Sequence, residues 1–324
     1  MNQLRRKNLL IAFDAFGTLF TPGEPIAKQY GDVARRCGMT SIDSEALQSS
    51  FSSAFKAESR RHPNFGKEMG MQSFDWWGNI IKSTFRPFLR EGQQLPERLV
   101  PELLRRFSTS EGYDIYPDVI PFLRMIRNTK QNPNASMNWP WDLTVVGVIT
   151  NTDNRVPGVL RSLGLEVGPR MIGQSGSRTQ KAHVDEDISF VTLSYDVGAE
   201  KPDQRIFDAA KTLLQETLDS EGLAASAGKH DGEQYSGPSL DAEDFVHLFV
   251  GDDLEKDILG AQAAGWNGVL VDRKGAYAGF FREGQKIIRI STDTRKPAKA
   301  GSKGDVLVIQ DFFGLQDWSP SELE

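Results

Sequence analysis

The chain has 324 residues, of which 39% are hydrophobic and 25% charged, as is typical of a folded protein with one large domain or a domain carrying an insertion. Its formal net charge of -6 argues against a general nucleic-acid binder. The single cysteine, Cys37, excludes an intrachain disulfide and a zinc site built from several cysteines. No apolar run approaches the length needed to span a membrane, so we expect no membrane partner.

The first residues, MNQLRRKN, are basic and lead directly into an apolar stretch without a secretory leader. We therefore expect a cytosolic protein and leave the nucleus open as a further compartment. The sequence does not indicate an oligomeric state.

The segment Asn8–Thr21 predicts a buried strand that presents one acid. Apolar residues run from Leu9 to Phe13, and Asp14 and a turn at Gly17 follow them. In open α/β sheets, ligands bind at the carboxyl ends of the strands, where Asp14 would lie. The alternative is an ordinary strand that happens to end in an acid, and this segment alone does not separate the two.

Residues 22–112 carry apolar residues mainly at helical spacing. A helix is predicted from Ile26, with Gly38 as its end. The adjacent Trp76 and Trp77 favour helix packing over a ligand platform, because large aromatic residues dominate protein cores. Three further helical patterns follow: Leu47–Phe55, Phe74–Phe85 and Leu99–Phe107. We expect a helical insertion between the first strand and the rest of a sheet.

The remainder alternates strand and helix patterns, which predicts an α/β fold with a doubly wound parallel sheet. The expected helices are Tyr116–Asn128, Val156–Leu163, Gln204–Glu216 and Leu254–Ala264. The expected strands are Leu143–Ile149, Phe190–Tyr195, Phe245–Val250, Asn267–Asp272, Lys286–Ile290 and Val306–Gln310. Polar loops are expected at Gln131–Trp141, Gly173–Asp187, Asp219–Asp244 and Arg295–Lys303.

Polar residues follow three of these strands. Asp14 ends the first, Thr150 and Asn151 end the second, and Asp252 and Asp253 end the strand that begins at Phe245, while Lys201 lies in a loop between the last two. In a parallel sheet these ends share one edge. Clustered carboxylates need a proton or a cation, and an oxygen-rich site suits Mg²⁺. A carboxylate facing such a site can act as a nucleophile toward a phosphoryl group.

Each of these residues also has an ordinary structural explanation. Thr150 or Asn151 could cap the following helix, and Lys201 could be a surface lysine. Asp252 and Asp253 would suit the start of a helix. The combination in this order favours a site over separate structural roles.

The four histidines (His62, His183, His230 and His247) show no metal-ligand spacing, and we expect each at the surface or hydrogen-bonded in the core. A nucleophilic Ser or Cys paired with one of them stays an open alternative, although no G-x-S-x-G nucleophile elbow is present.

With these motifs the chain resembles the haloacid dehalogenase-like (HAD) hydrolases, and in particular the eukaryotic haloacid dehalogenase-like hydrolase domain-containing proteins. The matching strings are DAFGT at Asp14–Thr18, Thr150–Asn151, Lys201–Pro202–Asp203 with Ile206–Phe207, and GDDLEKDILGAQAAG at Gly251–Gly265. The resemblance implies a Rossmann-like core in residues 1–21 and 113–324 and a helical cap in residues 22–112. It also implies a small-molecule substrate such as a phosphorylated metabolite.

The resemblance implies a role for each matching position. Asp14 would be the nucleophile and, with the Phe16 carbonyl, a Mg²⁺ ligand. Thr150 and Lys201 would bind the phosphoryl group, with Asn151 near them in the substrate site. Asp252 would hold Mg²⁺, supported by Asp253 and Asp257, and of these two Asp253 is counted among the metal ligands.

Phe16 departs from the phosphatase pattern. Phosphatases of the family usually carry a second Asp two residues after the nucleophile, which protonates the leaving oxygen. Losing a general acid lowers the rate by about 10²–10⁴-fold.

With an aromatic residue at this position, the first motif resembles the family's dehalogenases, whereas Asp252 and Asp253 favour a metal-dependent phosphatase. We expect Mg²⁺-dependent phosphoryl hydrolysis first, a 2-haloacid dehalogenase second, and a catalytically inactive binding or regulatory protein as the alternative to an enzyme.

Overall fold

A computed structural model describes residues 8–40, 42–131, 139–173, 180–223, 240–298 and 304–320. The chain forms two compact units. The first comprises Met1–Leu19, Tyr116–Asn151 and Leu165–Glu324, and the second comprises Phe20–Ile115 and Thr152–Gly164. The predicted insertion 22–112 lies within the second unit, which also includes residues 152–164; the predicted domain boundaries stay a prediction.

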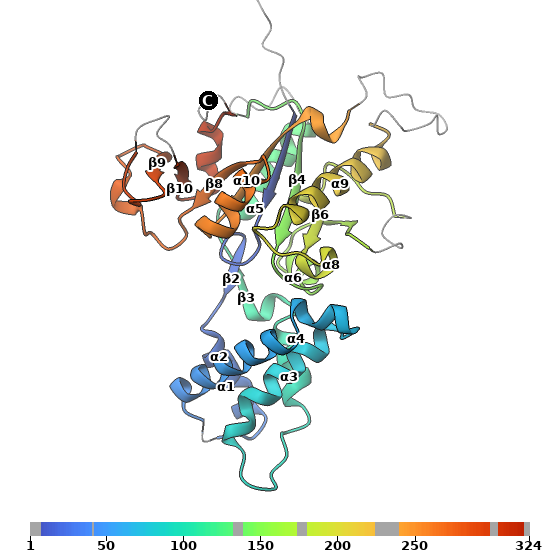
Figure 1. The fold of residues 1–324 in the computed structure, drawn as a ribbon, viewed down its shortest axis with the longest axis vertical. Helices are drawn as coiled ribbons and strands as arrows, with labels where there is room; N and C mark the ends of the chain where they lie inside the picture. Colours follow the sequence, from blue (N-terminus) through green and yellow to red (C-terminus); the bar gives the residue numbers. More distant parts are fainter. Residues whose placement is uncertain are drawn as a thin grey trace, which may run out of the picture. The chain divides into compact units, whose positions relative to one another are not determined.

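The first unit is built on an eight-stranded sheet in the order β5-β6-β4-β1-β7-β8-β10-β9 (Figure 1). All strand pairs are parallel except β10 with the edge strand β9. The strands are β1 (Asn8–Phe13), β4 (Thr144–Thr150), β5 (Val167–Arg170), β6 (Ile188–Leu193), β7 (Phe245–Gly251), β8 (Asn267–Val271), β9 (Ile287–Ser291) and β10 (Asp305–Ile309). The predicted α/β fold with a doubly wound, mainly parallel sheet is confirmed.

The central strand β1 is buried on both faces, which explains its unbroken apolar sequence. On one face, Leu10 and Ala12 pack into a core with residues of α9 (Gln204–Glu221) and α10 (Gly260–Ala263). On the other face, the ring of Phe13 contacts Phe122 of α5 (Val119–Gln131) and Phe312, at centroid distances of 6.4 and 4.6 Å. This two-sided packing fixes where β1 ends and Asp14 begins.

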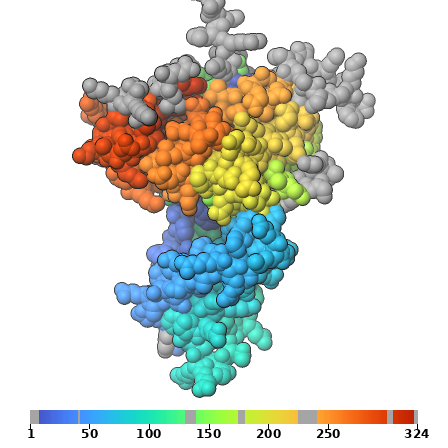
Figure 2. Space-filling model, in the orientation of Figure 1, coloured from blue at the N-terminus to red at the C-terminus, as the bar shows by residue number. Residues whose placement is uncertain are grey.

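The second unit is mainly helical, and Figure 2 shows its segment Phe20–Ile115, coloured blue to cyan, as one compact body. The helices are α1 (Ile26–Arg36), α2 (Ser44–Arg61), α3 (Ser73–Phe85), α4 (Leu99–Arg106) and α6 (Val156–Ser162). Trp76 and Ile80 of α3 pack against Ala54 of α2 in a buried cluster, with Trp77 partly buried against it, so the predicted packing role is confirmed. A short antiparallel pair, β2 (Phe20–Pro22) with β3 (Tyr113–Ile115), lies at the two ends of the insertion.

The structure adds elements that apolar spacing did not predict. The strands β2, β3 and β5 are short, and β5 contains Gly168 and Pro169, which are uncommon within strands. The helix predicted from Leu254 to Ala264 is a π-helix, η5 (Leu254–Leu259), followed by α10. None of the helices in the described ranges is long and apolar enough to cross a membrane.

The predicted loops overlap the gaps between the described ranges. Residues 132–138, 174–179, 224–239 and 299–303, one stretch in each predicted loop, lie outside the described residues, as do residues 1–7.

Phe122 offers a test of the packing behind β1. Its fully buried ring contacts Phe13, Trp139 and Phe312, so Phe122→Ala should lower the free energy of unfolding by about 3–5 kcal/mol. Urea unfolding measures this change. The control Phe280→Ala removes a ring that is 40% exposed and should change stability by less than about 0.5 kcal/mol; equal losses in the two variants would contradict the assigned core.

Candidate active site

Asp14 follows β1, the strand on either side of which the chain adds its later strands in opposite directions. β1 is flanked by β4, the next strand of the sheet along the chain, and by β7, which begins the other half. The Asp14 backbone N–H donates to the Val250 carbonyl at 2.9 Å, which extends the β1–β7 ladder by one residue. α/β proteins commonly bind ligands at such a switch point, at the carboxyl ends of the strands.

A buried lysine joins Asp14 to a second carboxylate. Lys201 Nζ lies 2.6 Å from Asp14 Oδ1 and 2.7 Å from Asp257 Oδ1, and only 2% of the Lys201 side chain is exposed. The ammonium group also lies 4.8 Å from the centre of the Phe249 ring. A lysine buried to this extent requires the two acids, because an unpaired charge in the core is strongly destabilising.

Asn151 holds Lys201 in position through the backbone. Its side-chain Nδ2 donates to the Lys201 carbonyl at 2.9 Å, and its Oδ1 accepts from the Lys201 N–H at 2.7 Å. Both ends of the amide are therefore used within the protein. Thr150, one residue earlier, is the buried last residue of β4 at the same sheet edge. The roles of Thr150 and Asn151 as substrate ligands stay predictions.

Asp252 completes a group of three carboxylates with Asp14 and Asp257. One ligand oxygen from each can be chosen so that all lie within 4.8 Å of one another. Gly17 makes room for this arrangement: its φ is +81°, and a Cβ there would lie 2.5 Å from Asp252 Oδ2. The exposed Lys274 lies 3.4 Å from the same oxygen.

Asp253, predicted beside Asp252 as a metal ligand, does not belong to this group of three. Its Oδ1 accepts hydrogen bonds from the N–H groups of Glu255 and Lys256, at 3.0 and 2.9 Å, and so caps the helical segment that follows. Asp257, expected only to support the metal, turns inward from that segment to Lys201, and its Oδ2 accepts from the Asp253 N–H. The structure thus places Asp257 where the sequence suggested Asp253.

The buried environment raises the pKa of Asp14 to about 6. Burial is the largest cause, the carboxylates of Asp257 and Asp252 add to it, and Lys201 opposes it. Burial, with Asp257 and Asp253 nearby, also raises the pKa of Asp252 against the effect of Lys274. Burial alone would lower the pKa of Lys201, but Asp14 and Asp257 outweigh it and raise that pKa. Within the group of Asp14, Asp252, Asp257 and Lys201, negative charge therefore exceeds positive charge.

A family model of the haloacid dehalogenase-like hydrolases matches residues 9–265 of the chain. The chain belongs to this family. An uncharacterized hydrolase of Schizosaccharomyces pombe is 30% identical over 278 residues, covering 86% of the chain and 96% of the relative. The haloacid dehalogenase-like hydrolase domain-containing protein 3 of Bos taurus is 24% identical and covers 81% of each chain.

Among solved structures, the HAD-hydrolase YfnB of Bacillus subtilis bound to magnesium is 13% identical, with a TM-score of 0.46 over 83% of this chain and 91% of YfnB.

The sequence of this HAD-like hydrolase did not reveal one further residue that supports the site, Arg273. Its Nη2 and Nε donate to the Thr18 carbonyl at 2.9 and 3.1 Å, and its Nη1 donates to Asp118 Oδ1 at 2.8 Å. Its guanidinium lies over the rings of Tyr116 and Phe312. Arg273 therefore anchors the turn that follows Asp14. A single arginine after a strand carries no sequence signal for such distant partners.

The anchoring role of Arg273 predicts a large loss on substitution. Arg273→Gln should lower the free energy of unfolding by about 3–5 kcal/mol, because Asp118 would remain buried without its charge partner. Thermal and urea unfolding measure the change. Arg282→Gln, at an exposed arginine, is the matched control and should shift stability by less than about 0.5 kcal/mol. A neutral Arg273→Gln would show that the turn does not depend on this contact.

The raised pKa of Asp14 predicts the pH dependence of stability in metal-free protein. Because the folded pKa of about 6 exceeds the unfolded value of 3.8, ionised Asp14 destabilises the fold fully above pH 6 and progressively less toward pH 4. With a chelator present, the free energy of unfolding of the wild type should rise relative to that of Asp14→Asn as the pH falls from about 7 to about 4, because only the wild type takes up a proton at Asp14. Urea unfolding of both proteins across this range measures the difference. A difference that does not change with pH would contradict the raised pKa of Asp14.

Proposed function

We propose that this HAD-like hydrolase is a Mg²⁺-dependent phosphohydrolase with Asp14 as its nucleophile. The observation that carries the proposal is the Asp14 carboxylate at the switch point of the sheet, contacted by buried Lys201 and grouped with Asp252 and Asp257. Family membership supports a hydrolase, and the site chemistry supports phosphoryl transfer over other hydrolytic reactions.

The donor set fits Mg²⁺. Three carboxylates meet with an excess of negative charge, and hard oxygen ligands are what Mg²⁺ prefers. We assign Asp14, Asp252 and Asp257 to the ion, keep the Phe16 carbonyl as a predicted ligand, and place the capping residue Asp253 outside the set. When bound, the ion would neutralise charge on the phosphoryl oxygens and on the carboxylates.

In the proposed first step, a carboxylate oxygen of Asp14 attacks the phosphorus atom. The new O–P bond forms as the bond to the leaving oxygen breaks, which gives an aspartyl-phosphate on Asp14 and releases an alkoxide or a better leaving group. Lys201 and Thr150 hold the phosphoryl oxygens. Water then attacks the phosphorus, releases phosphate and restores the Asp14 carboxylate. Because the attacking group must be ionised, Lys201 also serves to keep Asp14 charged.

Phe16 determines which substrates this site would hydrolyse well. A phenylalanine side chain cannot give a proton to the leaving oxygen, so alkyl phosphates would react slowly. Acyl and aryl phosphates have leaving groups that need little protonation. We therefore propose that the site works best on phosphate compounds of this kind.

Phe16 also favours one second candidate, a 2-haloacid dehalogenase. There Asp14 would displace a halide from carbon, and a halide leaves without a proton. The two reactions differ in what they need: the dehalogenase reaction would release halide and would not require Mg²⁺. Halide release that persists in a chelator would favour this candidate over the phosphohydrolase.

Replacing the nucleophile tests the proposed reaction. Wild-type protein should hydrolyse p-nitrophenyl phosphate and acetyl phosphate with Mg²⁺ and lose this activity in EDTA. Asp14→Asn should lower kcat on the order of 10⁴-fold, since an amide is not a nucleophile here. Asp208→Asn, at an exposed aspartate on α9, is the control and should keep full activity. A wild-type protein that turns over neither aryl nor acyl phosphates and releases no halide would end the enzyme proposal.

Restoring an acid tests the role of Phe16. Phe16→Asp should raise kcat on alkyl phosphates by about 10²–10⁴-fold, because it would supply the missing proton donor. Its effect on acetyl phosphate should be much smaller, since that leaving group needs no proton. A panel of phosphorylated metabolites measures both rates, with Phe16→Asn as the matched variant that adds polarity without an acid. Equal gains from the two variants would show that size or polarity, and not proton donation, limits the reaction.

A further inference from the structure

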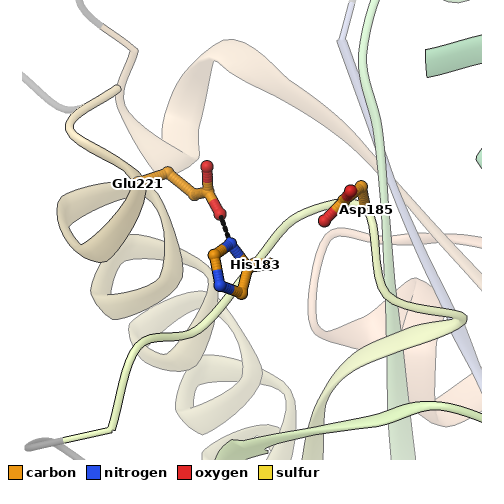
Figure 3. A group of neighbouring side chains, drawn as sticks. All are labelled: His183, Asp185 and Glu221. Atoms are coloured by element: carbon orange, nitrogen blue, oxygen red, sulfur yellow. Dashed lines mark ion pairs between the residues drawn. The ribbon is translucent and has the colours of Figure 1, made fainter. Parts of the chain in front are cut away.

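A second group of metal-ligating side chains lies in the first unit, away from Asp14. It consists of His183, Asp185 and Glu221, and one ligand atom from each can be chosen so that all lie within 4.8 Å of one another. Figure 3 shows the His183 ring directed at Glu221, with His183 Nδ1 and Glu221 Oε1 2.6 Å apart, and Asp185 on the same loop as His183. His183 and Glu221 are partly exposed, at 41% and 22% of their side chains, so a solvated ion can reach them.

This group lies at the amino-terminal ends of the parallel strands, whereas the candidate active site lies at their carboxyl ends. His183 and Asp185 precede β6, which begins at Ile188, whereas Asp14 follows the end of β1. Glu221 is the last residue of α9, which begins three residues after Lys201 and runs back past the sheet. The parallel strands therefore separate this group from the Asp14, Asp252 and Asp257 carboxylates.

The end of α9 favours a cation at this position. A helix C-terminus carries partial negative charge, which basic side chains usually offset. The last turn of α9 has no basic residue and instead carries Asp219 and Glu221. The His183 imidazole is turned toward this end. A bound cation would offset both the helix end and the two carboxylates of the group.

We propose that His183, Asp185 and Glu221 form a second metal site, which binds Zn²⁺ or a similar divalent transition metal. One imidazole nitrogen with two carboxylate oxygens is a donor set that suits Zn²⁺, whereas Mg²⁺ prefers oxygen ligands alone. Three protein ligands leave a coordination position for water. The ion would join the loop before β6 to the end of α9, so its main effect would be on stability. This site stands independently of the proposed phosphohydrolase activity.

The experiment is a calorimetric Zn²⁺ titration of the full, EDTA-stripped chain in excess Mg²⁺, which occupies oxygen-only sites. The wild type should bind Zn²⁺ at one tight site and show a higher Tm with Zn²⁺ than with Mg²⁺ alone. His183→Ala and Asp185→Asn should each weaken this binding by at least about 10-fold, because loss of even an outer-sphere partner of a metal costs about 10–100-fold. The Zn²⁺-dependent rise in Tm should disappear with the binding.

Two controls make the result decisive. His62→Ala removes a histidine that contacts Glu58 in the other unit, and Asp14→Asn alters the candidate active site; both should keep the tight Zn²⁺ site. In EDTA, His183→Ala should have the same Tm and circular dichroism as the wild type, which excludes misfolding. Zn²⁺ binding that is absent from the wild type, unchanged by His183→Ala, or lost in Asp14→Asn would overturn the proposal.

Discussion

The ion pairs of Lys201 with Asp14 and Asp257 are the constraint on which the candidate site depends. They join three segments that are far apart in the sequence at one edge of the sheet, with Nζ–O distances of 2.6 and 2.7 Å. A buried lysine is tolerated only with such partners, and the acids in turn crowd together around it. Asn151 fixes the backbone of Lys201. The result is a buried site with more carboxylates than ammonium groups, as a bound cation would require.

The strands and the edge at which they end could be predicted from the sequence because parallel strands buried on both faces have continuous apolar sequences. Leu9–Phe13 is such a run, and the polar residue that ends it is therefore at the ligand-binding edge. The same reasoning located Thr150 and Asp252, whereas Lys201 was predicted from its place in a loop between strands and from the resemblance to the family. Helical spacing likewise revealed the helices of residues 22–112, where a helix must bury one face.

Residues whose roles depend on orientation could not be predicted in this way. Asp252 and Asp253 are adjacent acids, and the sequence does not show that one faces the site while the other caps the next helix. Asp257 enters the site because it follows one turn later in that helical segment. Arg273 acts through Thr18 and Asp118, contacts that only the folded sheet creates. The short strands β2, β3 and β5 owe their pairing to neighbours and not to their own apolar pattern.

The central claim is that Asp14 becomes covalently phosphorylated during turnover. Rapid mixing with acetyl phosphate and Mg²⁺, an acid quench, and mass spectrometry of the peptide that contains Asp14 measure this directly. We expect the mass of one phosphoryl group on Asp14 during turnover, and none after the substrate is consumed. Turnover of acetyl phosphate without any phosphorylated Asp14 peptide at the earliest quench times, or a phosphoryl group on another residue, would contradict the account.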